Sequence, residues 1–133
     1  MASLAFSAAY GEPEMTLRDE VQRHYGKRVS RNEGCCAPQV DGMEVPSFGC
    51  GAPTEFADLE LGEKVLDLGS GAGLDCFRAA EKVGEAGRVI GVDMTAAMRA
   101  RARRGAAQLG LAQVEFREGY IEACPWRQRA STW

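Results

Sequence analysis

The residues with the clearest chemical potential form one short segment, Asp67 to Gly73, with the sequence DLGSGAG. Glycines let a backbone turn sharply and let a ligand approach it closely. A helix beginning after such a turn offers free N–H groups and a positive dipole end, where a carboxylate or phosphate can bind. A dinucleotide site would carry Gly-x-Gly-x-x-Gly, but the residue three positions after Gly71 is Leu74. The spacing is instead Gly-x-Gly-x-Gly, preceded by an acid.

The acid Asp67 discriminates between the ligands that such a turn could hold. Its carboxylate would repel a pyrophosphate and attract a cationic amino group. S-adenosylmethionine carries that ammonium group, and its own carboxylate can take the helix N–H groups. A plain tight connection between a strand and a helix is the alternative, and Leu74 with Asp67 disfavours a nicotinamide oxidoreductase. We expect the nucleotide to bind at Asp67, Gly69, Ser70, Gly71 and Gly73.

Further candidates follow the next two expected strands. An acid at Asp93 can accept hydrogen bonds from ribose hydroxyls. Ile121 could cover an adenine face, and Glu122 could accept a hydrogen bond from the adenine amino group. Alone, Asp93 could equally be a helix cap and Ile121 a core residue. Together with the glycine turn, these residues predict a nucleotide site at the carboxyl edge of an open α/β sheet.

The segments around these residues alternate between strand and helix patterns. Short apolar strands are expected over residues 64–68, 88–92 and 113–117. Helices are expected over about 74–83 and from a cap at Thr95 to about Leu109, with Gly110 ending the second. Strand and helix in this order predict an α/β fold, with the three strands parallel, joined by right-handed crossovers and arranged third, second, first.

The N-terminal part has a different pattern. Thr16 and Asp19 resemble a capping box, and a helix ending near Ser30 is predicted by apolar residues at four-residue steps: Leu17, Val21, Tyr25 and Val29. Residues 31–52 predict a long loop, and Pro53 favours a short helix to about Leu59. We therefore divide the chain into an N-terminal helix with a cysteine-bearing loop, a cofactor-binding half domain and an aberrant tail, over residues 1–52, 53–125 and 126–133.

Composition excludes several classes of protein. The chain has 133 residues, 45% of them hydrophobic and 26% charged, which is ordinary for one globular domain. A net charge of −3 favours neither nucleic acid nor an anionic membrane as a partner, and the arginines from Arg99 to Arg104 are interpreted as a solvated helix face. No apolar stretch approaches the ~20 residues needed to span a bilayer, and we expect a cytoplasmic protein.

The five cysteines need an explanation other than disulfides. An odd number in a chain of this composition does not resemble a secreted disulfide framework, so thiols are expected. Zinc is disfavoured because there is no Cys-x-x-Cys pair and His24 is the only histidine, so we expect no metal site. Cys76 lies on a helix directly behind the glycine turn, where a structural role is favoured over a chemical one.

The stretch from Gly62 to Thr95 resembles the motif region of arsenite methyltransferases. The most telling parts are Leu74-Asp75-Cys76 after the glycine turn and Val92-Asp93-Met94-Thr95 after the second strand. The similarity continues through residues 107–111 and 119–122. Upstream it includes residues 21–26 and the Gly-Cys-Gly loop within residues 48–53. The resembling part covers about residues 17–125.

This resemblance implies a Rossmann-like class I methyltransferase fold and methyl transfer to trivalent arsenic, the chemistry of arsenic detoxification. It places Met94 beside Asp93 in the cofactor site, and it gives arsenic chemistry or thiol exchange to Cys50 and to either Cys35 or Cys36. Trivalent arsenic prefers thiolate sulfur. A thiol reductant such as thioredoxin or glutathione is then the expected partner, and the substrate is arsenite or its thiol conjugate.

The chain departs from this family after its third expected strand. The family continues with more strands and further cysteines, whereas residues 124–133 match no family pattern. The hypothesis is a truncated form, arising from a frameshift or premature stop, in which the first strand has an unpaired edge. Weak cofactor binding and little arsenic methylation are expected of such a chain. The alternatives are a methyltransferase for another small molecule and a fragment that binds cofactor or arsenic without turnover.

Overall fold

The computed structural model describes residues 15–31, 39–45 and 58–123 of the chain. Its centre is a parallel sheet of three strands, β3 (Lys64–Leu68), β4 (Arg88–Asp93) and β5 (Val114–Glu118), in the order β3-β4-β5. The predicted topology is therefore confirmed. The second strand is one residue longer than expected and the third is shifted by one residue, which is the usual uncertainty at element ends.

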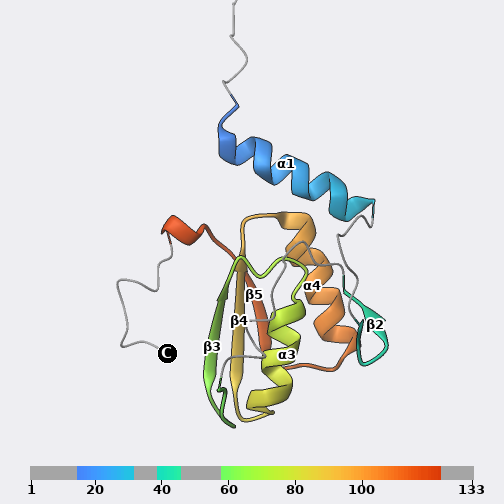
Figure 1. Ribbon diagram of the computed structural model, residues 1–133, viewed down its shortest axis with the longest axis vertical. Coiled ribbons are helices and arrows are strands. Elements are labelled where there is room, and N and C mark those ends of the chain that lie inside the picture. The colour runs from blue at the N-terminus through green and yellow to red at the C-terminus, as the bar shows by residue number, and fades with distance from the viewer. Residues whose placement is uncertain (1–14, 32–38, 46–57, 124–133) are drawn as a thin grey trace, which may run out of the picture.

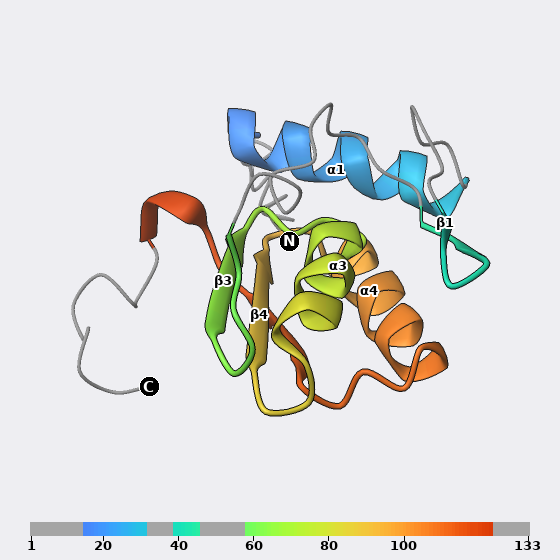
Figure 2. The ribbon, with the colours of Figure 1, turned by 60° about the horizontal axis from the view of Figure 1, so that its bottom comes forward.

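Two helices, α3 (Leu74–Val83) and α4 (Ala96–Gln108), connect the strands and cover the same face of the sheet (Figures 1 and 2). The core lies between these helices and the strands. Its largest side chains include Phe77 from α3, which is fully buried, and Phe116 from β5. The two rings meet edge to face, with centroids 6.1 Å apart, an arrangement that aromatic quadrupoles favour.

The ends of α4 follow the predicted signals only in part. Gly110 has a φ of 68°, and the N–H of Leu111 donates to the carbonyl of Ala106, so the helix ends in a Schellman motif as expected from the glycine. Thr95 is the N-cap residue, but its side chain makes no capping hydrogen bond. Its backbone N–H is bound instead by the side chain of Asp93.

Helix α1 (Leu17–Ser30) begins with the predicted capping box. The Thr16 N–H donates to the Asp19 carboxylate at 3.0 Å, and the Asp19 N–H donates to the Thr16 hydroxyl at 3.2 Å. The helix lies across the end of the sheet at which the strands terminate (Figures 1 and 2). Its predicted apolar face is not a core face, because Leu17 is 77% exposed and Tyr25 is 36% exposed.

The expected long loop over residues 31–52 is not irregular throughout. Two short strands, β1 (Gln39–Val40) and β2 (Met43–Glu44), form a small antiparallel hairpin. Asp41 and Gly42 make the turn with φ values of 48° and 79°, and Asp-Gly is a preferred pair for a turn with two positive φ angles. Buried Val40 and Val45 attach this hairpin to the core. The three loop cysteines Cys35, Cys36 and Cys50, the tail and the segment from Pro53 to residue 57 lie outside the described residues.

None of the helices in the described ranges combines the length and the apolar composition that crossing a membrane requires.

Candidate functional site

A cavity of about 480 Å³ lies at the carboxyl end of the sheet, between α1 and the segments that leave β4 and β5. Several predicted cofactor residues line it together: Gly69, Asp93, Met94, Ile121 and Glu122. They come from the ends of three successive strands, as the order of the motifs along the chain implied. The short helix η1 (Ile121–Ala123) supplies the last two. The lining residues do not include four other predicted cofactor residues, Asp67, Ser70, Gly71 and Gly73.

The turn between β3 and α3 takes a shape that needs its glycines. Gly69, Gly71 and Gly73 have φ values of 80°, 54° and 93°, in the region that L side chains rarely adopt. A Cβ at Gly73 would come within 2.8 Å of the Phe116 ring, whereas a Cβ at Gly71 would meet nothing within 4 Å. Gly73 therefore serves the packing of α3, and Gly71 leaves open space where a ligand could approach the backbone.

Ser70 in the same turn faces the protein interior. It is 8% exposed, and a Cβ added at Gly91 would lie 2.7 Å from its hydroxyl oxygen. Within the described part of the chain, this oxygen is the buried side-chain polar atom without a hydrogen-bond partner. An unpartnered buried hydroxyl carries a desolvation cost.

The carboxylate of Asp93 ties the glycine turn to the start of α4. One oxygen accepts from the Gly71 N–H at 3.1 Å, and the other accepts from the Thr95 N–H at 2.7 Å. The position of Asp93 is therefore compatible with both of its predicted roles, as a ligand contact and as an acceptor at the end of a helix. Each carboxylate oxygen has a further lone pair, so hydroxyl donors from the cavity can still be accommodated.

Asp67 belongs to β3, just before the turn, and is paired with Cys76 of α3. The Cys76 thiol donates to the Asp67 carboxylate at 3.3 Å. Burial raises the pKa of Asp67, and the nearby carboxylates of Asp75 and Asp93 raise it further, against the thiol hydrogen bond. Burial also raises the pKa of the Cys76 thiol, with the charge of Asp67 acting in the same direction. Cys76 is thus a buried, protonated thiol with a structural partner, as its sequence position favoured.

Helix α1 supplies part of the cavity wall that the sequence did not indicate. Leu17, Arg18 and Val21 line it. Arg18 forms an ion pair with Glu122, and its guanidinium lies 4.4 Å from the centre of the Tyr120 ring. The apolar spacing of Leu17 and Val21 was a usable signal, but nothing local distinguishes a face that lines a cavity from one that packs into a core.

The hydrogen bond from the Gln22 amide to the Met94 carbonyl, at 2.8 Å, fixes α1 to the end of β4. The pKa of Glu122 is lowered by its own backbone N–H and by Arg18, so this carboxylate is ionised at neutral pH. The residue predicted to accept from an adenine amino group is therefore held by the guanidinium of Arg18, which lines the same cavity.

One correction concerns the arginines of α4. Arg99 is 7% exposed, so it does not belong to a solvated helix face. Its guanidinium donates to the Asp93 carbonyl at 2.9 Å and to the Glu118 carboxylate at 2.8 Å. The prediction failed because the two acceptors lie at the ends of strands, and helix periodicity contains no information about them.

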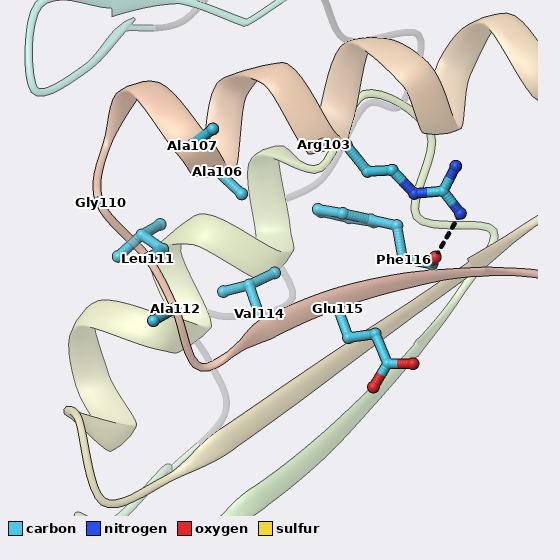
Figure 3. Close-up of a pocket in the computed structure, with 9 residues that line it drawn as sticks. All are labelled: Arg103, Ala106, Ala107, Gly110, Leu111, Ala112, Val114, Glu115 and Phe116. Atoms are coloured by element: carbon cyan, nitrogen blue, oxygen red, sulfur yellow. Dashed lines mark hydrogen bonds between the residues drawn. The ribbon is translucent and has the colours of Figure 1, made fainter.

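A second cavity, of about 470 Å³, lies between the C-terminal half of α4 and β5 (Figure 3). Ala106, Leu111, Val114 and Phe116 make it mostly apolar, and Arg103 crosses it to donate to the Phe116 carbonyl at 2.8 Å. It contains neither the glycine turn nor Asp93. The cavity at the carboxyl end of the sheet is therefore the candidate site.

The candidate site fits S-adenosylmethionine in size and in charge. Its volume is within the roughly 300–1,000 Å³ of small-molecule pockets. Asp93 lines the cavity beside the open backbone at Gly71, and Asp67 lies close enough to interact electrostatically with Asp93, which suits a ligand bearing an ammonium group and ribose hydroxyls. Ile121 is 60% exposed at the cavity, which leaves an apolar surface for an aromatic base.

Comparisons with known proteins agree with this geometry. A family described as "Methyltransferase domain" matches residues 59–131. The chain is 46% identical over 107 residues to an arsenite methyltransferase of Halobacterium salinarum, covering 80% of the chain and 27% of the relative. It is 37% identical over 134 residues to an arsenite methyltransferase of Aquipseudomonas alcaligenes, and this match covers 80% of the chain and 36% of the relative. Methyltransferases named for other substrates match over shorter segments.

Among solved structures, the YcgJ protein from Bacillus subtilis superimposes with a TM-score of 0.50 and 32% identity, covering 55% of this chain and 30% of that one. The chain spans about a quarter to a third of the length of the curated relatives named above. The family match covers more than half of the chain and includes the whole glycine turn, Asp93 and the η1 segment. The chain belongs to the family of S-adenosylmethionine-dependent methyltransferases.

Proposed function

We propose that this chain supplies the cofactor-binding part of an enzyme that methylates trivalent arsenic. The observation that best supports this proposal is that one cavity at the carboxyl end of the sheet is lined by Gly69, Asp93, Ile121 and Glu122. Asp93 would accept from the ribose hydroxyls, Ile121 would cover the base, and Asp67 would attract the amino group. When bound, S-adenosylmethionine supplies an electrophilic methyl group on a sulfonium.

Arsenic as the acceptor is supported by the cysteines and by the names of two relatives. Cys35, Cys36 and Cys50 provide thiols in the part of the chain before β3, and trivalent arsenic prefers thiolate ligands. Arsenic held by thiolates keeps a lone pair, so the protein need not supply a general base. Catalysis then depends mainly on alignment of the reactants. A thiol reductant such as thioredoxin or glutathione would keep these cysteines reduced, and the cytoplasm suits such chemistry.

Calorimetric titration with S-adenosylhomocysteine tests the cofactor site. We expect binding to the wild type and about ten- to hundredfold weaker binding to Asp93→Asn, because a charge-assisted hydrogen bond contributes about 1.5–3 kcal/mol. Asn keeps one acceptor oxygen for Gly71 or Thr95, and circular dichroism checks that the variant is folded. Glu85→Ala, in the exposed turn before β4, is the matched control and should bind as the wild type does.

A second titration, with arsenite, tests the acceptor. Arsenite should bind to the wild type under reducing conditions and bind less to Cys50→Ser, while S-adenosylhomocysteine affinity stays the same. Cofactor binding without arsenite binding would support the cofactor site but contradict arsenic as the substrate. Another small molecule would then be favoured as the methyl acceptor. A methylated arsenical formed with S-adenosylmethionine would support the complete proposal.

A further inference from the structure

Arg99 is a buried charge in the first turn of α4. It is 7% exposed, whereas Arg103 and Arg104 on the same helix are exposed. Its partner carboxylate on Glu118 is 66% exposed. Taking a guanidinium out of water is unfavourable unless its donors are matched, and buried ion pairs often add little to stability. A contribution to stability therefore does not explain why a charged arginine is buried at this position.

The two acceptors of Arg99 are the last residues of neighbouring strands. One guanidinium nitrogen donates to the Asp93 carbonyl at 2.9 Å, and the other donates to the Glu118 carboxylate at 2.8 Å. Asp93 and Glu118 are direct partners in the register of β4 and β5. The planar fork of a guanidinium can bridge two such acceptors, which an ammonium group reproduces poorly.

The two strand ends joined by Arg99 carry both halves of the nucleotide site. Asp93 itself faces the cavity, and the chain leaving Glu118 becomes Gly119 and then Ile121, which line it. The Gly119 N–H also approaches the Asp93 carbonyl, at 3.4 Å. This carbonyl is therefore shared between Arg99 and the start of the segment that would cover the base. Arg99 is not among the residues that line the cavity.

We propose that Arg99 is a positioning residue of the cofactor site, which fixes the separation between the ribose-binding acid Asp93 and the base-covering segment at Ile121. The proposal rests on the proposed cofactor function, since it assigns those two roles. The guanidinium acts through the backbone of Asp93 and the side chain of Glu118. The site would then be preorganised, so less ordering of the segment after β5 is needed when the nucleotide binds.

Arg99→Met, Arg99→Lys and Ala106→Gly separate positioning from stability. Methionine fills a similar volume without charge, so we expect the melting temperature of Arg99→Met to equal or exceed that of the wild type. Its affinity for S-adenosylhomocysteine should nevertheless fall roughly tenfold, with partial recovery in Arg99→Lys. Ala106→Gly lies on the buried side of the same helix and should lower the melting temperature without changing affinity.

Titrations are made at a temperature at which circular dichroism shows every variant to be folded. Wild-type affinity in Arg99→Met would overturn the positioning role while leaving the proposed function intact. A loss of affinity in Ala106→Gly equal to that in Arg99→Met would also overturn it, because affinity would then follow general helix integrity. Absence of binding by the wild type itself would count against the cofactor site, and it would remove the basis of this proposal.

Discussion

At the scale of single residues, Asp67 is a carboxyl group whose ionisation the fold opposes. Its pKa is raised by burial first and then by Asp75 and Asp93, although the Cys76 thiol donates to it. A cationic ligand would relieve this repulsion among acids. Under the proposed function, Asp67 would therefore lower stability and raise affinity for a positive charge, as functional sites often do.

The variant Asp67→Asn removes the charge and keeps an oxygen that can accept from Cys76. Because the folded-state pKa is raised, the stability that Asp67 contributes is present in acid and is lost as the pH rises through that pKa. We expect Asp67→Asn to melt higher than the wild type near neutral pH, by ~4 °C for each ~1 kcal/mol recovered. The gap should close as the pH falls toward the ordinary carboxyl value of 3.8.

Melting curves by circular dichroism, taken at several pH values, check this prediction for both proteins. A gap that does not change with pH would show that ionisation of Asp67 is not the cause. The same variant should bind S-adenosylmethionine less tightly at neutral pH, because the attraction for the ammonium group is lost. Asp19→Asn is a poor comparison, since that acid belongs to the capping box of α1, whereas Glu85→Gln is a suitable exposed control.

The cofactor roles of the acids and glycines stay predictions, but residue spacing did indicate which of them would come together. Asp93 and Ile121 line one cavity although 28 positions separate them in the sequence, because parallel strands bring their carboxyl ends to one edge. The environment of Arg99 could not be predicted in this way. Its acceptors, the Asp93 carbonyl and Glu118, become neighbours of the helix only when β4 and β5 pair.

At the scale of elements, α1 closes one side of the cavity. It is attached to the rest of the site at two points, the hydrogen bond from Gln22 to the Met94 carbonyl and the contacts of Arg18 with Glu122 and Tyr120. Arg18 and Glu122 have side-chain exposures of 47% and 59%, so their ion pair adds little to stability. It does, however, join α1 directly to the η1 segment.

Arg18→Met should therefore leave the melting temperature nearly unchanged and weaken S-adenosylhomocysteine binding modestly, by roughly three- to fivefold, which corresponds to about 1 kcal/mol. The affinity of the wild type should fall as salt is added, because exposed ion pairs are screened, and that of Arg18→Met should respond less. Arg23→Met, exposed on the same helix, is the matched control. Equal effects of the two substitutions would contradict a specific role for Arg18.

The elements of the sheet were predictable because each one carries its own pattern. The strand Lys64–Leu68 and the helix Leu74–Val83 have the bounds expected from apolar runs and glycines. The hairpin at residues 39–45 was missed because its strands have only two residues each. Asp41-Gly42 was a local signal that could have located its turn. The role of α1 as a cavity wall could not be predicted from the sequence, since the apolar pattern of a helix face does not specify what that face will contact.

At the scale of the whole molecule, β3 is an edge strand within the described residues, where it pairs only with β4. Its last residue, Leu68, is 41% exposed, and the strand sequence KVLDL is mostly apolar. Natural edge strands are commonly protected by charged side chains, because unpaired N–H and C=O groups can pair with another chain. Lys64 is the one cation that β3 carries, and it lies at the far end from Leu68.

We expect the chain to self-associate through β3 as its concentration rises, and we expect Leu68→Lys to suppress this association by placing a charge on the exposed end of the strand. Leu61 is 82% exposed and precedes the strand, so Leu61→Lys is the matched control for a general loss of apolar surface. Sedimentation velocity over a concentration series distinguishes the two. Suppression by Leu68→Lys alone would identify the strand edge, because the same charge was added in both variants. Equal suppression by Leu61→Lys would assign the association to exposed apolar surface in general. A concentration-independent sedimentation coefficient of the wild type would show that β3 does not pair with a second copy.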